Sequence, residues 1–228
     1  MEDSCCLILE TSTPQGSVAL AMPDGRLEIL DFASDCSHNA VLFAPLQAIL
    51  DGRGELRISL VLVGSGPGSY SGTRVGIAAA QGVAIALGCP VVALPSILAV
   101  PSAAQGQACL AIGDARRGSY WMAKIKNLHL ISGPTLTDLA GLQETLKNHL
   151  ASGLSVFSFE DPTRFPLPAE LGAQVKLEFP NAAALWQAWR HADDATRAAW
   201  AAEIPQPIYL KPPHITPAKL KNPCVATV

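Results

Sequence analysis

The sequence predicts an α/β protein of two lobes with mixed sheets, of which the second lobe is reduced. A run of three short strands opens the chain and predicts an antiparallel meander. A strand, a glycine-rich loop, a helix and another strand follow, and this βαβ order requires a parallel pair of strands. A second set of strands and helices then repeats the theme less clearly. The expected divisions are a first lobe over 1–103, a second lobe over 104–204 and an extended tail over 205–228.

The composition narrows the class of protein. The chain has 228 residues, of which 49% are hydrophobic and 15% are charged, which is typical of a globular protein with a buried core. Its net charge of −3 argues against a protein that binds RNA mainly through phosphate contacts, so any contact with RNA should run through a partner. The acidic opening Met1-Glu2-Asp3 is unlike a signal peptide, and glycine and proline interrupt the apolar stretch over 83–100. We therefore expect a cytoplasmic protein without a membrane span.

The first lobe begins with short apolar runs separated by turn residues. Strands are expected at 5–9, 17–21 and 27–32, and the turn between the first two is rich in hydroxyl groups. A helical period follows over 37–50, with Ser37 as a candidate N-cap. Pro45 predicts a kink or a late start of this helix, because proline cannot donate a backbone hydrogen bond.

The βαβ unit and the second lobe follow. In the unit, a buried strand over 59–63 leads into the glycine loop, a helix runs from about 72 to 87, and a strand follows at 91–94. Thr137 or Asp138 should cap the helix of the second lobe, and Asn181 should cap a later one. The expected strands of the second lobe are 108–112, 119–125, 155–159 and 174–179. From Pro205 the proline-rich tail should lie extended across the surface.

The glycine loop lies where a buried strand gives way to a helix, a place that favours an anion. No lysine lies in it, so it is not a P-loop, and Ser69 and Ser71 break both frames of the dinucleotide pattern GxGxxG. Tyr70 occupies the serine position of a nucleophile elbow. Two interpretations stay open: a turn that meets a ligand, or glycines that let helix and sheet pack closely. The glycines are Gly64, Gly66, Gly68 and Gly72.

Small residues also crowd one helix, and metal-binding spacings are missing. The helix over 72–87 is rich in glycine and alanine, which suits either a subunit interface or close packing on the sheet. The six cysteines form no CxxC pair, so we interpret them as buried apolar residues or thiols. The five histidines contain no HxxxH pair, so no metal site is expected. The histidines are His38, His129, His149, His191 and His214.

The loop sequence GPGSYSGTRVG, over 66–76, closely resembles the GPGSFTGLRIG signature of the TsaB family, also called YeaZ. Other stretches agree in order across nearly the whole chain. These are LILETST followed by SVAL in the first hairpin, SH with the later Leu42, Pro45 and Leu46, DARRG followed by Tyr120, and PIYLK over 207–211.

This resemblance implies an actin-like ATPase fold, which is ribonuclease-H-like. It implies a non-catalytic partner of the threonylcarbamoyltransferase TsaD, in the synthesis of threonylcarbamoyladenosine on tRNA. TsaD carries an HxxxH metal pair that this chain lacks. Further expected partners are a TsaE-like ATPase, a second copy of the chain when it is alone, and tRNA only through the complex. The alternative is a stand-alone actin-like ATPase, kinase or peptidase, although no nucleophile–base pair is visible.

The resemblance also assigns residues. Glu10 stands where many actin-like enzymes carry Asp, and Ser12 stands where nucleotide-hydrolysing relatives usually have glycine, which argues against ATP hydrolysis by this chain. No cofactor of its own is expected, and weak adenine-nucleotide binding stays open. The residues expected at such a nucleotide site are Thr11, Ser12, Thr13, Gly66, Gly68 and Ser69. The residues expected at the partner interface are His38, Leu42, Pro45, Tyr70, Ser71, Gly72, Arg74, Val75, Gly76 and Ala79.

The turn at Arg116 and Arg117 has two open interpretations. Arginine forks suit a phosphate or a protein partner, whereas arginines in a turn are also common at solvated corners. The sequence alone does not separate the two.

Overall fold

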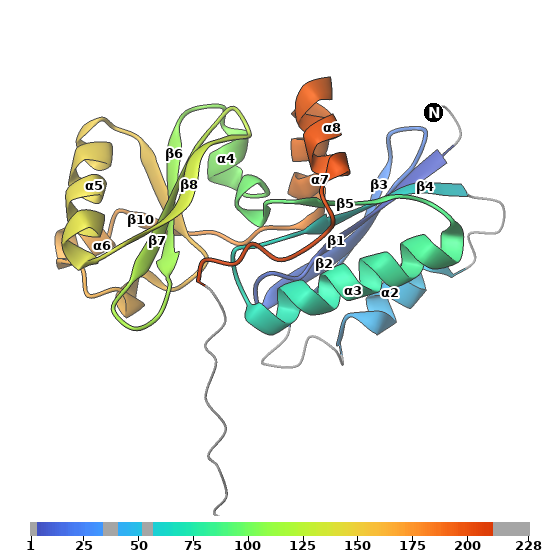
Figure 1. Cartoon of the computed structure of the whole chain (residues 1–228), viewed down its shortest axis with the longest axis horizontal. Coiled ribbons are helices and arrows are strands. Elements are labelled where there is room, and N and C mark those ends of the chain that lie inside the picture. The colour runs from blue at the N-terminus through green and yellow to red at the C-terminus, as the bar shows by residue number, and fades with distance from the viewer. Residues whose placement is uncertain (1–3, 34–40, 52–56, 212–228) are drawn as a thin grey trace, which may run out of the picture.

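The computed structural model describes residues 4–33, 41–51 and 57–211, which form two five-stranded sheets set side by side (Figure 1). In the first sheet the order is β3-β2-β1-β4-β5. The three N-terminal strands are antiparallel, whereas β4 pairs with β1 and β5 pairs with β4 in parallel. The strands are β1 Ser4–Glu10, β2 Gln15–Ala21, β3 Leu27–Ala33, β4 Arg57–Gly64 and β5 Val91–Leu94.

The second sheet repeats this plan, with the order β10-β9-β6-β7-β8. Again three strands form an antiparallel meander, and two more add to it in parallel. This doubled arrangement of antiparallel and parallel strands confirms the predicted α/β fold of the actin-like, ribonuclease-H-like kind. The strands are β6 Cys109–Asp114, β7 Tyr120–Lys126, β8 His129–Thr137, β9 Ser155–Ser158 and β10 Val175–Leu177.

The second lobe is reduced at its crossover. In the first lobe β4 and β5 are joined through α3, Tyr70–Leu87, which has 18 residues. The corresponding connection from β9 to β10 holds only the 3-10 turn η2, Pro162–Arg164, and the four-residue helix α6, Ala169–Gly172. The second sheet is therefore covered on this side by much less helix than the first.

Helices cover the two faces of the first sheet from different parts of the chain. The face of β1 that carries Leu7 and Leu9 packs against α2, Phe43–Leu50, and against α3. The opposite face, which carries Ile8, packs against α7, Ala182–His191, although α7 follows the second sheet in sequence. A last helix, α8, Asp194–Ala202, lies against β5. Because α7 returns to the first sheet, its side chains form one hydrophobic core together with residues of both lobes.

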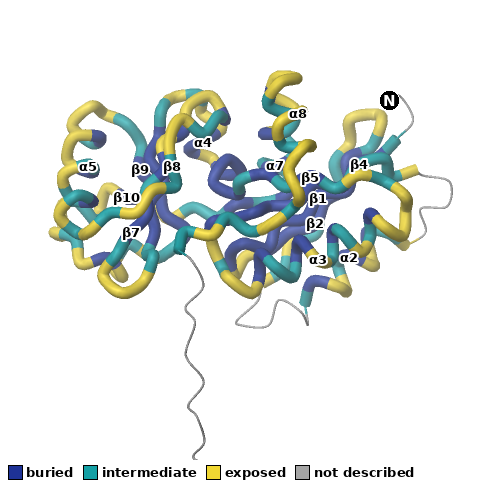
Figure 2. Tube along the Cα trace, in the orientation of Figure 1, coloured by how far each residue is buried: buried dark blue, intermediate teal, exposed yellow. Residues whose placement is uncertain are grey.

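Shorter helices complete the packing. The second sheet has α5, Leu139–Ala151, on its outer face. The turn η1, Ser96–Leu98, and α4, Pro101–Ala104, connect the two sheets and belong to the shared core. Figure 2 shows that burial is concentrated along the central strands of both sheets, whereas the outer helices are largely exposed on one side.

Capping residues fix several helix ends as predicted. Pro45 lies in the first turn of α2, where no backbone donor is needed; of the helix predicted over 37–50, only the part from residue 41 on is described. Asp138, rather than Thr137, caps α5, and Asn181 caps α7. The proposed N-cap Ser37 lies outside the described residues. The strand β8, His129–Thr137, and the helix α8, Asp194–Ala202, were not predicted from the sequence.

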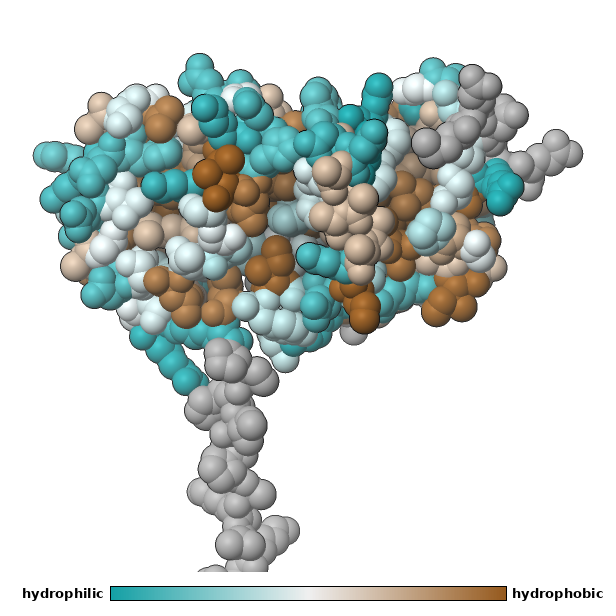
Figure 3. Space-filling model, turned by 45° about the horizontal axis from the view of Figure 1, so that its top comes forward, coloured by the Kyte–Doolittle hydropathy of each residue, from teal (hydrophilic) through white to brown (hydrophobic). Residues whose placement is uncertain are grey.

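The cysteines and the surface complete the description. Cys5, Cys6 and Cys109 are buried, and Cys89 is half-buried, as expected for small apolar side chains. Among the helices that the structure describes, none is long and apolar enough to cross a membrane. On the face drawn in Figure 3, hydrophobic side chains lie in several separate groups between hydrophilic ones.

Candidate functional site

The glycine loop between β4 and α3 is bound directly to the turn between β1 and β2. The backbone N–H of Ser69 donates to the carbonyl oxygen of Ser12 at 2.6 Å. The Thr11 hydroxyl donates to the carbonyl oxygen of Gly72 at 2.8 Å. The two loops are distant in sequence, and these bonds, which we call the clasp, hold them together at the edge of the sheet where β1 and β4 end.

The glycines of the loop are explained by this close contact. A Cβ at Gly68 would overlap the Ser12 carbonyl oxygen, and one at Gly64 would overlap the Glu10 carboxylate. Gly76, in the second turn of α3, has the Thr11 hydroxyl against it in the same way. Gly66 has a φ of +85°, which side chains rarely adopt. Close packing therefore accounts for Gly64, Gly68 and Gly76, and backbone conformation accounts for Gly66.

The backbone donors of the loop are largely used within the protein. Gly66 donates its N–H to the Ser96 hydroxyl at 2.9 Å, and Gly72 donates to the Ser69 hydroxyl at 3.1 Å. Thr73 donates to the Ser69 carbonyl at 3.0 Å. In a phosphate-binding loop such N–H groups would face the anion. Here the Ser69 N–H bonds to the neighbouring turn, the Gly66 N–H bonds to Ser96, and the N–H groups of Gly72 and Thr73 bond to the N-cap Ser69, so these four donors are already used within the protein.

Ser96 was missed by the sequence analysis. It follows β5, the parallel neighbour of β4, and its N–H also donates to the Gly66 carbonyl at 2.8 Å. A usable signal exists: loops after neighbouring parallel strands meet at the same sheet edge.

A buried carboxyl lies beneath the clasp. Glu10 is fully buried, and its Oε1 accepts a hydrogen bond from the Ser12 N–H at 2.7 Å. Its Oε2, and the buried Ser12 hydroxyl, have no hydrogen-bond partner among the described residues. Burial raises the pKa of Glu10 above its usual value, and the neighbouring Ser12 and Ser96 groups oppose this only in part. The site therefore favours the neutral acid.

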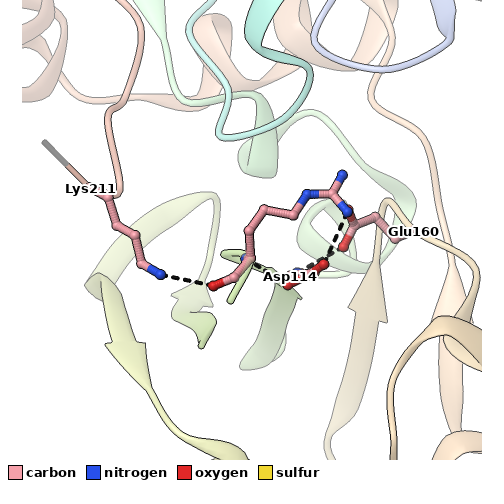
Figure 4. Close-up of polar contacts among 4 residues, drawn as sticks. Asp114, Glu160 and Lys211 are labelled. Carbon is pink, nitrogen blue, oxygen red and sulfur yellow. Dashed lines mark hydrogen bonds and ion pairs between the residues drawn. The ribbon is translucent and has the colours of Figure 1, made fainter. Parts of the chain in front are cut away.

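The described part of the C-terminal tail, residues 205–211, crosses from the first lobe to the second, and we call it the strap (Figure 1). The Ile208 N–H donates to the Ser65 carbonyl of the glycine loop at 2.9 Å. The Lys211 ammonium donates to the Arg116 carbonyl at 2.9 Å, as Figure 4 shows. The strap thus connects the glycine loop to the turn between β6 and β7.

That turn carries Arg116 and Arg117, both with positive φ, at 66° and 59°. Arg116 forms an ion pair with Asp114 at 3.1 Å, and the Asp114 N–H donates to the Glu160 carboxylate at 2.8 Å (Figure 4). Both arginines are exposed. The internal ion pair restrains the Arg116 side chain, and its exposure fits a solvated corner as well as a contact with a phosphate or a partner.

An apolar groove lies between α2 and α3 on the outer side of the first lobe, with a volume of about 580 Å³. Phe43, which lines it, is a large apolar side chain with an exposed fraction of 55%. Tyr70, the first residue of α3, is 70% exposed. The groove is lined by Phe43, Leu46, Val75, Ala78, Ala79, Gly82, Val83 and Ala86.

The expected site residues fall into two places. All six expected at a nucleotide site lie in the two loops that the clasp joins, and four of them are buried: Thr11, Ser12, Thr13 and Gly66. Of those expected at the partner interface, Tyr70 and Ser71 are exposed, and Pro45, Arg74, Val75 and Ala79 are half-buried. Val75 and Ala79 line the groove. Leu42, Gly72 and Gly76 are buried, so a partner at this face would meet their neighbours instead. His38 lies outside the described residues.

The described residues also offer little for a metal ion. Within them, no three side chains of His, Cys, Asp or Glu come together in an arrangement that could hold one. His149 is buried in α5, far from the clasp in sequence, and burial lowers its pKa.

Comparison with known proteins identifies relatives of this chain. A family model described as "TsaD: tRNA N6-adenosine threonylcarbamoyltransferase" matches residues 51–184. The "tRNA threonylcarbamoyladenosine biosynthesis protein TsaB" of Haemophilus influenzae is 30% identical over 131 residues, which are 55% of this chain and 55% of the relative. The protein of the same name from Escherichia coli is 31% identical over 122 residues, 50% of this chain and 52% of the relative. The chain thus spans about half the length of these relatives.

A solved structure agrees with the fold. YeaZ from Pseudomonas aeruginosa superposes with a TM-score of 0.63 at 22% sequence identity, covering 91% of this chain and 100% of that one. At this identity the likeness concerns the fold alone. The family model covers more than half of the chain, and the predicted resemblance is confirmed: this chain belongs to the family of the TsaD model, in its TsaB (YeaZ) group.

Proposed function

We propose that this chain is a non-catalytic partner of a TsaD-like threonylcarbamoyltransferase, in the synthesis of threonylcarbamoyladenosine on tRNA. Relatives that carry the name of this pathway support the tRNA-modification role. The observation that carries the partner role is the apolar groove between α2 and α3, with Phe43 exposed beside it. Exposed apolar side chains at a groove favour a protein partner over solvent.

The state of the glycine loop supports a role in assembly over one in chemistry. The N–H groups of Ser69, Gly66 and Gly72 donate to Ser12, Ser96 and Ser69, so they are already used within the protein. A nucleotide phosphate would have to displace these bonds. We therefore expect ATP to bind weakly, if at all, and the clasp to fix the N-terminal end of α3 for the partner.

The remaining partners follow from the same proposal. The groove face would pair with a second copy of the chain when the transferase is absent, and with the transferase when it is present. A TsaE-like ATPase would join the assembled pair, and tRNA would be held by the complex rather than by this acidic chain.

Reconstitution tests the proposal. The TsaD-like paralogue would be purified with and without this chain, and threonylcarbamoyl transfer to tRNA would be measured with the other pathway components present. We expect full transfer only when both chains are present. Equal transfer by the paralogue alone would refute the partner role, and rapid ATP turnover by this chain alone would refute the non-catalytic one.

Exchange of Phe43 for aspartate tests the groove directly. The side chain is 55% exposed, so the substitution should leave the fold intact. It should weaken co-purification with the paralogue, because a charge would then enter an apolar contact. Exchange of Ile131 on β8, which is 61% exposed, for aspartate is the matched control and should have no effect on binding.

A further inference from the structure

The two helices that flank the groove carry almost no charge. Neither α2 nor α3 contains an acidic residue, and Arg74 is the single charged residue in both helices. Arg74 lies one turn before Ala78, which lines the groove, so it borders the groove on α3 without being one of its lining residues. A lone positive charge therefore stands beside an otherwise uncharged groove.

Two tyrosine rings hold this charge in place. The Arg74 guanidinium carbon lies 3.3 Å from the centroid of the Tyr70 ring and 5.0 Å from that of Tyr209. Its Nη1 donates to the Tyr70 carbonyl at 3.1 Å, and its Nη2 donates to the Tyr209 hydroxyl at 2.9 Å. Tyr70 belongs to α3 itself, whereas Tyr209 belongs to the strap and arrives from the far end of the chain.

The arginine has unused bonding capacity. A guanidinium has five N–H donors, and the two bonds described use neutral oxygen acceptors. Arg74 forms no ion pair with a carboxylate among the described residues. Because Arg74 is only half-buried, its remaining donors can be reached from outside.

We propose that the partner at this face presents a carboxylate to Arg74, and that Tyr209 of the strap is a positioning residue that holds the guanidinium for it. This inference rests on the proposed function and names the chemistry of the contact. Arginine and tyrosine packed together are typical of the residues that dominate interface energies. A carboxylate that accepts a bidentate bond from Arg74 would also fix the orientation of the partner.

The charges favour a different protein over a second copy of this chain. In a symmetric pair built from this face, α2 and α3 of one copy would meet α2 and α3 of the other. These helices hold no carboxylate to pair with Arg74. An acidic partner surface would satisfy the charge, so it should bind more tightly than a second copy.

Tyr209 can hold the Arg74 guanidinium in position because the strap that carries it is itself bound to the first lobe. The Ile208 N–H bonds to the buried Ser65 at the glycine loop, and the Pro205 carbonyl accepts from Gln81 of α3 at 3.5 Å. These bonds hold the strap between Gln81, in the C-terminal half of α3, and the glycine loop that precedes α3.

The test measures binding of the full chain to the purified TsaD-like paralogue by calorimetry, with melting temperatures as a check on folding. Exchange of Arg74 for glutamate should weaken binding at least about 30-fold. Exchange of Arg190, an exposed arginine of α7, for glutamate makes the same charge change elsewhere and should alter binding by less than about threefold. Self-association of the chain, measured by sedimentation, should not weaken with Arg74→Glu.

Tyr209→Phe removes one hydroxyl and keeps the ring. It should weaken binding about fivefold in the wild-type chain and by less than about twofold in an Arg74→Ala chain, because its effect passes through the arginine. A purely structural role would give the same loss in both. If the wild-type chain binds and these variants bind equally well, the inference is wrong and the partner role stands. If the wild-type chain does not bind the paralogue, the proposed function fails and the inference with it.

Discussion

The buried Glu10 allows a strong test of how the clasp is held together. Glu10→Gln keeps the shape of the side chain and removes its ability to ionise. The carboxyl is fully buried, one of its oxygens has no hydrogen-bond partner among the described residues, and burial raises its pKa. Glutamine should therefore remove a cost that the wild-type protein carries at neutral pH.

The size of the effect follows from proton linkage. In the unfolded chain Glu10 loses its proton near the ordinary glutamate pKa of 4.5, whereas in the folded protein the pKa is higher. Above pH 4.5 the folded state therefore binds more protons, and the free energy of unfolding falls as pH rises through this window. The slope reaches about 1.4 kcal/mol per pH unit until the folded-state pKa is passed. Glu10→Gln has no such slope, so its advantage over the wild type should grow from pH 4.5 upward.

Urea unfolding followed by tryptophan fluorescence, at several values between about pH 4.5 and 8, measures this difference. Glu144→Gln is a matched control, since Glu144 is exposed on α5 and should give curves parallel to the wild type. A stability difference between Glu10→Gln and the wild type that does not change with pH would refute the reasoning. If Glu10→Gln instead became less stable than the wild type as pH rises, the predicted sign of the stability difference would be wrong.

Three further predictions concern packing, acid and capping. Gly68→Ala should lower the free energy of unfolding by about 1–3 kcal/mol, because its Cβ overlaps the Ser12 carbonyl; Gly82→Ala, where nothing lies within 4 Å, is the control in the same thermal melts. Burial lowers the pKa of His149, so the unfolded state binds more protons below pH 6.5 and stability should fall there; His149→Leu should flatten that acid limb in urea titrations. Asn181→Ala should cost about 1 kcal/mol by chemical denaturation, since its side chain caps α7 at 2.8 Å.

Local patterns predicted much of the fold. The strand, glycine loop and helix of the first lobe were visible because apolar runs, glycines and capping residues are neighbours in sequence. The helix caps at Asp138 and Asn181 were visible for the same reason. The edge strand β8 was not, because glycine and proline at 133 and 134 interrupt its pattern, and only an edge strand tolerates proline there.

The parts of the candidate site that the sequence did not predict depend on contacts between residues far apart in the chain. In the sequence Ser96 only interrupts an apolar stretch, yet in the structure its hydroxyl accepts the Gly66 N–H. Tyr209 matched the family pattern but indicated no partner, and its bond to Arg74 spans 135 positions. No periodicity carries such information. The nucleotide pattern of the loop was ambiguous for a related reason: whether its N–H groups are free is decided by the neighbouring hairpin turn.

The return of α7 to the first sheet affects how the protein is made. Ile8 and Leu62 lie on a sheet face that α7 covers with Leu185 and Ala188, more than a hundred residues later in the chain. During synthesis, this face stays uncovered until the whole second lobe has left the ribosome. A nascent or truncated chain that ends before α7 would carry a bare apolar sheet, and such a fragment should depend on chaperones and be prone to aggregation.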